Sequence, residues 1–344
     1  MKAYELVPGK GFESLHLVDR ASRALDAHEV RVKINAAAIN FRDLMISGGD
    51  YGITEAKAVV PLSDGAGEVI EVGAAVSRFN IGDLVIPGFW PQWSEGQISP
   101  DKVSASFGSV TDGTLAEELV TDESALTLAP AGLSAEEAAT ISCAGVTAWN
   151  ALFVKGNLKP GGSVLILGTG GVSIWALQLA HAAGIRTLVT SSSDTKLARA
   201  RELGANETIN YRQHTEWQNE VIRLTNGLGV DLVIEVGGEG TMKRSIEATR
   251  LGGTIVVVGG RAGGASTKDA AVDPRALIVG AKTLAGMMVG SRTMQEDLVR
   301  FIETAGIRPV IDHVYAFTEA AAAYRHVETG AFGKVVISIG QTRP

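Results

Sequence analysis

The sequence predicts an α/β protein that combines a β-rich domain with a doubly wound parallel sheet. Its 344 residues are too many for one typical hydrophobic core, so we expect two domains. Residues 1–125 carry short strand patterns separated by glycine and proline. From Ser134 onward, strand and helix patterns alternate, which is typical of parallel strands joined by right-handed crossovers.

The charge and composition of the chain argue against several classes of partner and site. The formal net charge of -7 and the lack of a basic run argue against nucleic acid and anionic membranes as partners. The single cysteine, Cys143, excludes an intrachain disulfide and a thiolate-rich metal site. No apolar run approaches the roughly 18 residues of a membrane span, and the start does not read as a signal peptide. We therefore expect a soluble cytoplasmic protein that acts on a small molecule.

The N-terminal part has four short strand patterns, whose spacing favours a compact, partly open barrel. The predicted strands cover residues 30–34, 67–72, 83–87 and 115–120. Residues 90–113 are polar and aperiodic, so we interpret them as a long loop with a functional role.

The stretch 161–184, GGSVLILGTGGVSIWALQLAHAAG, is the most informative in the chain. Residues 164–167 are typical of a buried strand, glycines end it abruptly, and helical spacing follows. Gly168, Gly170 and Ser173 match the GxGxxG pattern with serine at the third position, where a small residue allows close packing. The loop predicts a dinucleotide with its pyrophosphate at the helix N-terminus, although an ordinary glycine-rich turn would fit the same residues.

Further elements alternate along the chain. A capping box at Ser134 and Glu137 begins an alanine-rich helix. Other helices are predicted at 146–154, 172–183, 195–203, 242–248, 294–305 and 320–327. Other strands are predicted at 187–190, 208–210, 231–235, 254–258, 283–289 and 334–339. The first five of these complete a six-stranded dinucleotide-binding sheet, and the last is expected to return to the β-rich domain.

The end of the second strand of this sheet predicts which nucleotide binds. Three serines, 191–193, stand there without a carboxylate, and Lys196 follows. Hydroxyls and a cation favour a 2'-phosphate, whereas an acidic residue would bind the ribose diol, so we expect NADP(H). Asp194 is interpreted as the N-cap of a helix that begins at Thr195.

Seven segments carry a family resemblance: AAAINFRDL (36–44), PLSDGAGEVIEVG (61–73), FNIGDLV (79–85), SCAGVTAWNAL (142–152), GTGGVS (168–173), residues 190–204 and INY (209–211). With these, the chain resembles the medium-chain dehydrogenase/reductase superfamily, and within it the zinc-lacking quinone oxidoreductase-like branch. The resemblance implies a Rossmann domain, residues 126–290, inserted into a GroES-like catalytic domain formed by residues 1–125 and 291–344. It also implies an active-site cleft between the domains and a homodimer joined through 283–289.

The resemblance also implies the site residues. Those for the cofactor are Gly168, Thr169, Gly170, Gly171 and Val172 in the loop, Ser192, Lys196 and Tyr211 at the 2'-phosphate, and Gly237 and Gly259 beside the ribose and nicotinamide. Asn40 is implied as a catalytic hydrogen-bond donor, with a capping or turn asparagine as the alternative. Tyr51 is implied as a cleft residue that donates a proton or stacks on a quinone. Met45 replaces a tyrosine of some quinone reductases, which favours a more apolar pocket.

We expect no catalytic zinc. Zinc-dependent relatives have a cysteine near Asn40, a His-Glu pair at Ser63 and Asp64, and a third ligand near Cys143. Only Asp64 and Cys143 are ligand types here, fewer than the three protein ligands that catalytic zinc requires. We interpret Cys143 as a small buried residue, with a reactive thiol as the alternative. Asp43 and Asp64 are interpreted as structural or supporting residues.

The expected activity follows from this lack of a Lewis acid. Without zinc, hydride from NADPH is expected to go to an acceptor that is already activated, namely a quinone or an α,β-unsaturated ketone or aldehyde. The pocket is expected to be formed by the Tyr51 region, the 90–113 loop and residues 261–290. Two alternatives remain: an alcohol dehydrogenase-like enzyme that interconverts alcohol and carbonyl, and a non-enzymatic NADPH-binding protein.

Overall fold

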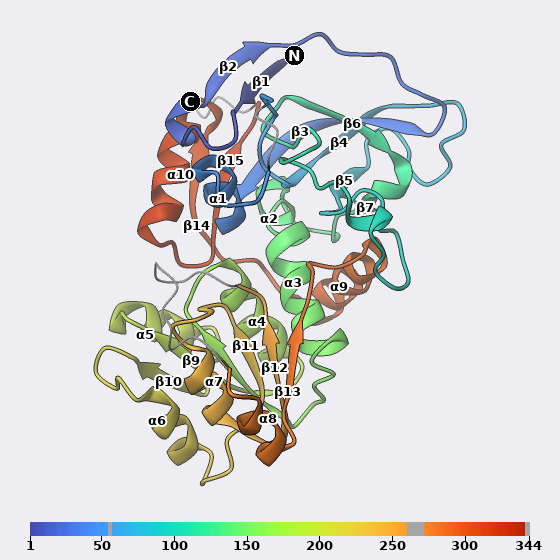
Figure 1. The fold of residues 1–344 in the computed structure, drawn as a ribbon. Coiled ribbons are helices and arrows are strands. Elements are labelled where there is room, and N and C mark those ends of the chain that lie inside the picture. The colour runs from blue at the N-terminus through green and yellow to red at the C-terminus, as the bar shows by residue number, and fades with distance from the viewer. Residues whose placement is uncertain (54–56, 260–271, 341–344) are drawn as a thin grey trace. The chain divides into compact units, whose positions relative to one another are not determined.

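The computed structural model describes residues 1–53, 57–259 and 272–340. Two compact units divide the chain: Met1–Val146 with Val289–Pro344, and Thr147–Met288 (Figure 1). The first division lies after Val146 rather than at the predicted 125/126, because the intervening residues pack on the first unit. Ser142 Oγ, for example, donates to the Pro87 carbonyl at 2.7 Å.

The first unit is built on a seven-stranded sheet in the order β14-β15-β3-β4-β5-β7, with β6 paired to β3. The pair β14 and β15 is parallel, whereas β15, β4 and β6 each run antiparallel to β3. Its strands are β1 (Lys2–Glu5), β2 (His16–Asp19), β3 (Glu29–Ile39), β4 (Asp64–Val72), β5 (Leu84–Pro87), β6 (Glu118–Asp122), β7 (Leu126–Leu128), β14 (Ile311–Ala316) and β15 (Lys334–Ser338). Its helices are α1 (Phe41–Gly48), α2 (Ala135–Ala138), α9 (Arg292–Ala305) and α10 (Ala320–Thr329).

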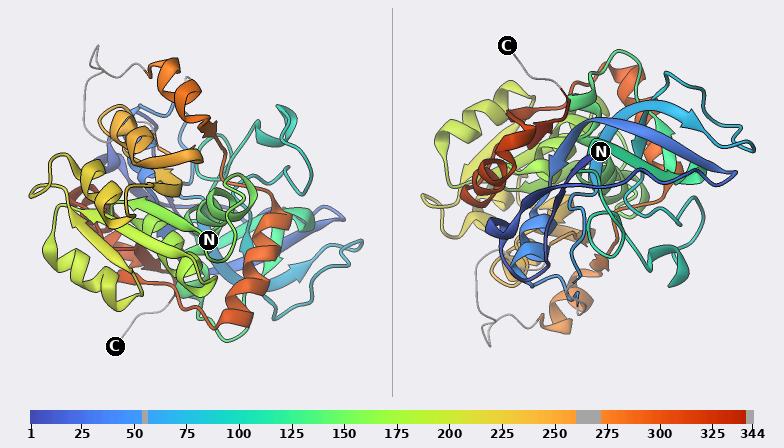
Figure 2. Two further views of the ribbon diagram at one scale, coloured as in Figure 1. Left: turned by 90° about the horizontal axis from the view of Figure 1, so that it is seen from below. Right: turned by 90° about the horizontal axis from the view of Figure 1, so that it is seen from above.

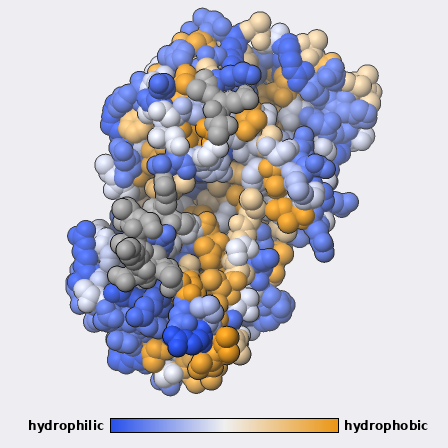
Figure 3. Space-filling model, in the orientation of Figure 1, coloured by the Kyte–Doolittle hydropathy of each residue, from blue (hydrophilic) through white to orange (hydrophobic). Residues whose placement is uncertain are grey.

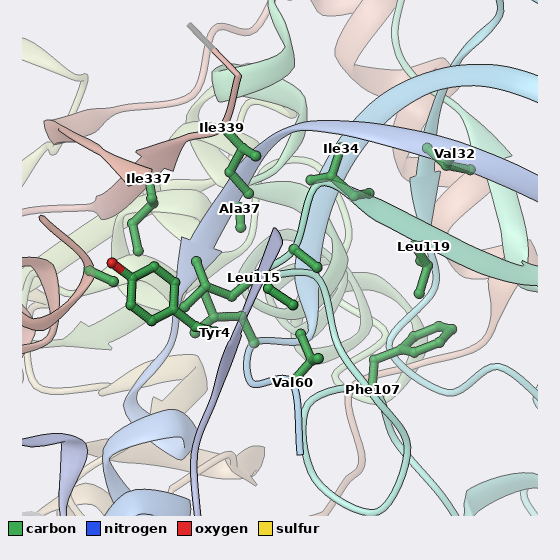
Figure 4. Close-up of a cluster of buried hydrophobic side chains, with 14 of the residues drawn as sticks. Tyr4, Val32, Ile34, Ala37, Val60, Phe107, Leu115, Leu119, Ile337 and Ile339 are labelled. Atoms are coloured by element: carbon green, nitrogen blue, oxygen red, sulfur yellow. The ribbon is translucent and has the colours of Figure 1, made fainter. Parts of the chain in front are cut away.

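The C-terminal strand joins the core of this unit as predicted. Val335 to Ser338 pair antiparallel with β3, and Ile337 and Ile339 lie among buried side chains from β3 and from residues 60 to 119 (Figure 4). Strand β3 contributes Val32 and Ile34 to this core and, after a register shift between Ile34 and Ala36, Ala37. The core therefore depends on both ends of the chain.

The second unit contains the doubly wound sheet, with the strand order β10-β9-β8-β11-β12-β13. All five strand pairs are parallel, and helices lie on both faces of the sheet (Figure 2). Its strands are β8 (Ser163–Leu167), β9 (Arg186–Ser191), β10 (Glu207–Asn210), β11 (Val230–Glu235), β12 (Thr249–Val257) and β13 (Thr283–Gly286). Its helices are α4 (Gly171–Ala182), α5 (Asp194–Glu202), α6 (Trp217–Leu224), α7 (Met242–Ala248) and α8 (Pro274–Gly280), and α3 (Val146–Trp149) begins at the division between the units. The predicted fold class is confirmed.

Several elements differ from the sequence predictions. Helix α1 was not among the predicted helices. It lacks a continuous apolar face, because the polar residues Arg42, Asp43 and Ser47 share its buried side with Ile46. The predicted helix 146–154 is α-helical only to Trp149 and continues as a π-turn. Within the described residues, no helix is both long and apolar enough to cross a bilayer.

Candidate functional site

The glycine loop after β8 has the geometry of a nucleotide cradle. Gly168 has φ +73°, a conformation that favours glycine, and α4 begins at Gly171. A Cβ added at Gly170 would meet no atom within 4 Å, so there is open space over the loop. The amides of the first helical turn, which includes Val172, have no partner within the helix. These features fit a pyrophosphate, which such amides and the helix dipole attract.

Ser173 takes over the packing role of the missing third glycine. Its side chain is buried, and its Oγ donates to the Leu167 carbonyl at 2.7 Å. This bond fixes the start of α4 to the end of β8. Thr169, between Gly168 and Gly170, is also buried.

Strands β9 and β10 bring the predicted 2'-phosphate residues into one region. Tyr211, which is 41% exposed, follows β10, and its amide donates to the Ser191 carbonyl at 3.1 Å. Ser192 is the next residue of that strand end, and Lys196 lies in the first turn of α5.

The N-cap of α5 is Ser193, and the predicted N-cap Asp194 is wrong. Ser193 Oγ accepts from the Lys196 amide. Asp194 is the first helical residue, and its carboxylate accepts from Asn210 Nδ2 at 2.7 Å and Gln213 Nε2 at 3.0 Å. The prediction placed the N-cap one residue too late, because serine and aspartate are both favourable N-cap residues and stand next to each other here.

The loop after β11 is held by a buried carboxylate that the sequence patterns did not reveal. Glu235 accepts from the Gly237 and Gly238 amides at 2.6 and 3.0 Å, and from the hydroxyls of Thr241 and Ser245. A Cβ at Gly237 would clash with Thr241. The structure thus gives Gly237 a packing reason as well as its predicted place near the nucleotide. Gly259, after β12, has a similar reason, since a Cβ there would lie 2.6 Å from the Val236 carbonyl.

A polar cluster lies where three adjacent strands of the first unit begin or end. Val335 pairs with Ile39 in antiparallel register, which sets Lys334 beside Asn40. Asp64 begins the neighbouring strand β4 and pairs with Ala38. Lys334 Nζ donates to the Ile39 carbonyl at 3.0 Å, to Asn40 Oδ1 at 2.6 Å and to Asp64 Oδ2 at 3.2 Å. Lys334 and Asp64 are both buried.

The side-chain nitrogen of Asn40 lies within this cluster without a hydrogen-bond partner among the described residues. It is the N-cap residue of α1, yet its side chain makes no capping bond, because its Oδ1 accepts from Lys334. Its backbone amide instead donates to Asp43 Oδ2 at 2.7 Å. The residue is 8% exposed, and its Nδ2 has no hydrogen-bond partner among the residues that the structure describes. A buried donor of this kind costs free energy until it meets an acceptor.

Arg42 links this cluster to Tyr51. Arg42 Nε donates to the Tyr51 hydroxyl at 3.2 Å, its Nη2 donates to Ser106 Oγ at 2.8 Å, and its Nη1 lies 3.8 Å from Asp43 Oδ1. Its guanidinium also lies 4.8 Å from the centre of the Tyr51 ring. Because the Tyr51 oxygen accepts from Arg42, its own proton can be donated elsewhere.

Tyr51 lines a cavity of about 700 Å³, which Asn40 does not line. The cavity brings the Tyr51 region and the 90–113 loop together, as expected. It is not apolar, because Lys57, Asp112 and three serines line it, and Met45 does not. The more apolar pocket predicted at Met45 is not tested by this cavity, and it stays a prediction. Residues 261–271, part of the expected pocket, lie outside the described residues.

Comparisons with known proteins now identify the family. Residues 26–131 match the alcohol dehydrogenase GroES-like domain, and residues 171–304 match the zinc-binding dehydrogenase family. A zinc-type alcohol dehydrogenase-like protein of Schizosaccharomyces pombe is 40% identical over 333 residues, 96% of each chain. The chain belongs to the medium-chain dehydrogenase/reductase superfamily.

Two further members of the superfamily are similar to the chain over nearly its whole length. A quinone oxidoreductase of Rattus norvegicus is 27% identical over 347 residues, covering 98% of this chain and 97% of that one. A solved NAD-dependent alcohol dehydrogenase is 33% identical, with a TM-score of 0.88 over 99% of this chain and 100% of that one. The chain is thus an NAD(P)-dependent oxidoreductase of this superfamily, with more similarity to the zinc-type alcohol dehydrogenase-like protein than to the quinone oxidoreductase.

The zinc implied by the family descriptions does not fit the donor set of this dehydrogenase/reductase. The position of the His-Glu pair holds Ser63, whose Oγ donates to Asp64, and Asp64 is paired with the Lys334 ammonium. Burial, and then the charge of Asp64, raise the pKa of the Cys143 thiol well above its usual range. Catalytic zinc needs about three protein ligands, whereas only Asp64 and Cys143 are ligand types here and Asp64 is already paired with an ammonium. The described residues contain no group of three His, Cys, Asp or Glu side chains that could hold a metal ion. The side chain of Cys143 is half-buried rather than buried as predicted. The raised pKa of its thiol argues against a reactive thiolate.

We predict that Asp43 titrates between pH 4 and 7. Burial raises its pKa from 3.8 to about 6, against the opposing effect of Arg42 and the Asn40 amide. Since the folded state holds this proton more tightly, the stability from this group is full below about pH 4 and lost as the pH rises through 6. The loss amounts to about 3 kcal/mol at most.

Urea unfolding of Asp43→Asn and of the wild type from pH 4.5 to 7.5 measures this effect. Asn keeps the acceptor for the Asn40 amide but carries no charge. We expect the stability of the variant, relative to wild type, to rise with pH across this range. A difference that stays constant would show that Asp43 does not titrate there.

Proposed function

We propose that this enzyme uses NADPH, without zinc, to reduce a carbonyl compound activated by conjugation: a quinone or an α,β-unsaturated ketone or aldehyde. The observation that carries the proposal is the buried Nδ2 of Asn40, which lies beside the Lys334 ammonium and has no hydrogen-bond partner within residues 1–53, 57–259 and 272–340. When bound, NADPH supplies the hydride, which adds to the acceptor carbon. The negative charge then gathers on the carbonyl oxygen, which takes up a proton to complete the reduction.

Asn40 is the proposed donor to that oxygen. Its Nδ2 is held in a buried site, where a hydrogen bond to developing negative charge is worth more than in water. Its Oδ1 accepts from the Lys334 ammonium, which leaves the Nδ2 hydrogens for an acceptor. A conjugated acceptor needs only such donors, because its charge is already delocalised over several atoms.

Tyr51 is the proposed second contact of the substrate. Its hydroxyl accepts from Arg42, so its proton is available to an oxygen in the cavity that it lines. The serines of this cavity provide further hydroxyls, which suits a substrate with more than one oxygen. A quinone has this chemistry.

NADP(H) is the proposed nucleotide on the evidence of Asp194. Its carboxylate is occupied by Asn210 and Gln213, so it does not replace the ribose-binding acid of NAD enzymes. Ser192, Tyr211 and Lys196 come together instead at the ends of β9 and β10. The NAD-dependent relative shows that this preference differs within the superfamily.

The interconversion of alcohols and simple carbonyls is the second candidate function. The name of the relative at 40% identity favours it, since that protein is described as zinc-type alcohol dehydrogenase-like. For this reaction the carbonyl would have to be polarised by Asn40, Lys334 and Tyr51. Zinc would not do so, because the donor set of the chain does not fit it.

We also propose that the protein is a homodimer through the outer edge of β13. This strand is the last of its sheet, and the neighbouring α8 exposes Ile278 and Val279. Apolar residues gather on the surface of the second unit in the view of Figure 3. An open edge beside exposed apolar residues suits pairing with a second copy. The particle mass in solution, twice the 35.9 kDa of the chain or equal to it, tests this proposal.

A matched pair of acceptors separates the two candidate functions. We expect NADPH oxidation with cyclohexenone and naphthoquinone, much slower oxidation with cyclohexanone, and no change on adding chelator or zinc. NADP+ reduction by a panel of alcohols is measured alongside. Turnover confined to alcohols and saturated ketones, and abolished by chelator, would support the second candidate. Tight NADPH binding without any turnover would indicate a non-enzymatic role.

We predict that Lys196→Ala weakens NADPH binding on the order of tenfold to a hundredfold, because a charge-assisted contact to the phosphate is lost. NADH binding should change little. Arg201→Ala, on the same helix α5, serves as the matched control for the loss of a cation and should leave both affinities near wild type. Equal losses for NADPH and NADH in Lys196→Ala would contradict the proposed phosphate site.

A further inference from the structure

Lys334 lies buried at the start of the C-terminal strand, with all three of its hydrogen bonds directed to the N-terminal part of the chain. An ammonium group has three hydrogens and no acceptor, so these bonds use all of its donors. The glycine before it has φ +79°, and a Cβ there would lie 2.5 Å from the Val310 carbonyl. The backbone that delivers Lys334 to this place is thus tightly constrained.

We propose that Lys334 is the positioning residue for Asn40: it holds the side-chain oxygen so that the amide nitrogen faces the substrate oxygen. This inference rests on the proposed role of Asn40 as a hydrogen-bond donor. Lys334 itself acts through Asn40 and does not donate to the substrate, because its hydrogens are already bonded.

Chemistry alone fixes the orientation of the Asn40 amide. The oxygen and nitrogen of an asparagine side chain have nearly the same shape, and a free side chain can turn either one toward a neighbour. Lys334 can only donate, so the atom 2.6 Å from its Nζ has to be the oxygen. The bond is short and charge-assisted, which makes the reversed orientation unfavourable. A neutral neighbour would not impose this choice.

Asp64 is the ion-pair partner of the buried ammonium. Its Oδ2 accepts from Lys334, and its Oδ1 accepts from Ser63 Oγ at 3.1 Å. The charges of Lys334 and Asp64 offset one another, as do those of Arg42 and Asp43 nearby. The cation therefore orients Asn40 without leaving an unpaired charge in the interior.

A merely structural role for Lys334 makes a different prediction. Breaking a buried ion pair by removing one partner is strongly destabilising, so Lys334→Met alone leaves Asp64 unpaired. The double variant Asp64→Asn/Lys334→Met removes both charges and should recover most of the stability. If Lys334 only balances Asp64, this double variant also recovers activity. If Lys334 positions Asn40, it folds but stays slow.

The orientation of Asn40 can be observed without a substrate. Full-length protein with 15N-labelled asparagine shows the side-chain NH2 signals, and loss of one pair in Asn40→Ala assigns those of Asn40. We expect a single sharp Asn40 pair in the wild type, and a shifted and broadened pair in Asp64→Asn/Lys334→Met. An unchanged pair in the double variant would overturn the proposal.

Steady-state kinetics with NADPH and cyclohexenone or naphthoquinone provide the second readout. We expect kcat to fall on the order of tenfold to a hundredfold in the double variant, with a smaller change in KM, because the donor is misdirected and not removed. Adding the same changes to Asn40→Ala should cause no further loss. A wild-type kcat, or an equal loss in the Asn40→Ala background, would contradict the proposal. If the wild type reduces no acceptor, the proposed function fails, while the Asn40 signals still decide the role of Lys334.

Discussion

The buried ammonium of Lys334 is the interaction on which the catalytic unit depends. It belongs to the last strand of the chain and bonds to Ile39, Asn40 and Asp64 near the beginning. Antiparallel pairing of β15 with β3 brings these residues together, so the polar cluster exists only when the tail has returned to the N-terminal sheet. Losing one member of such a buried pair costs about 3–5 kcal/mol. Folding of this unit and orientation of its proposed donor are therefore coupled.

The nucleotide-binding loop follows a separate physical rule. It needs open space and unpaired amides instead of charged side chains, and Gly168, Gly170 and the start of α4 supply both. Around it, buried side chains provide stiffness: Ser173 fixes α4 to β8, and Glu235 fixes the loop after β11. The loops after β8 and β11 are thus each held by the hydrogen bonds of one buried side chain, whereas the polar cluster of the first unit joins residues of three strands.

Sequence patterns predicted most of the fold because regular strand and helix periods persist through the second unit. These patterns failed where polar or charged side chains are buried, because they treat such residues as exposed. Helix α1 was missed because Arg42 and Asp43 face the interior, and Lys334 was taken for an ordinary first residue of a strand. A lysine at the head of a final strand that is otherwise apolar except for Ser338 was the available signal, yet its partners are 270 to 295 positions away in the chain. Such contacts follow from strand register, which short-range patterns do not contain.

The family descriptions and the donor set differ on one point, namely zinc. Reduction without zinc, the proposed function, requires that the cluster of Lys334, Asp64 and Asn40 holds no metal ion. Zinc content after equilibrium dialysis of chelator-free protein against zinc, measured together with NADPH oxidation, tests this claim most directly. The account predicts far less than one zinc per chain and unchanged turnover. One zinc per chain, lost together with activity in Cys143→Ser, would contradict it.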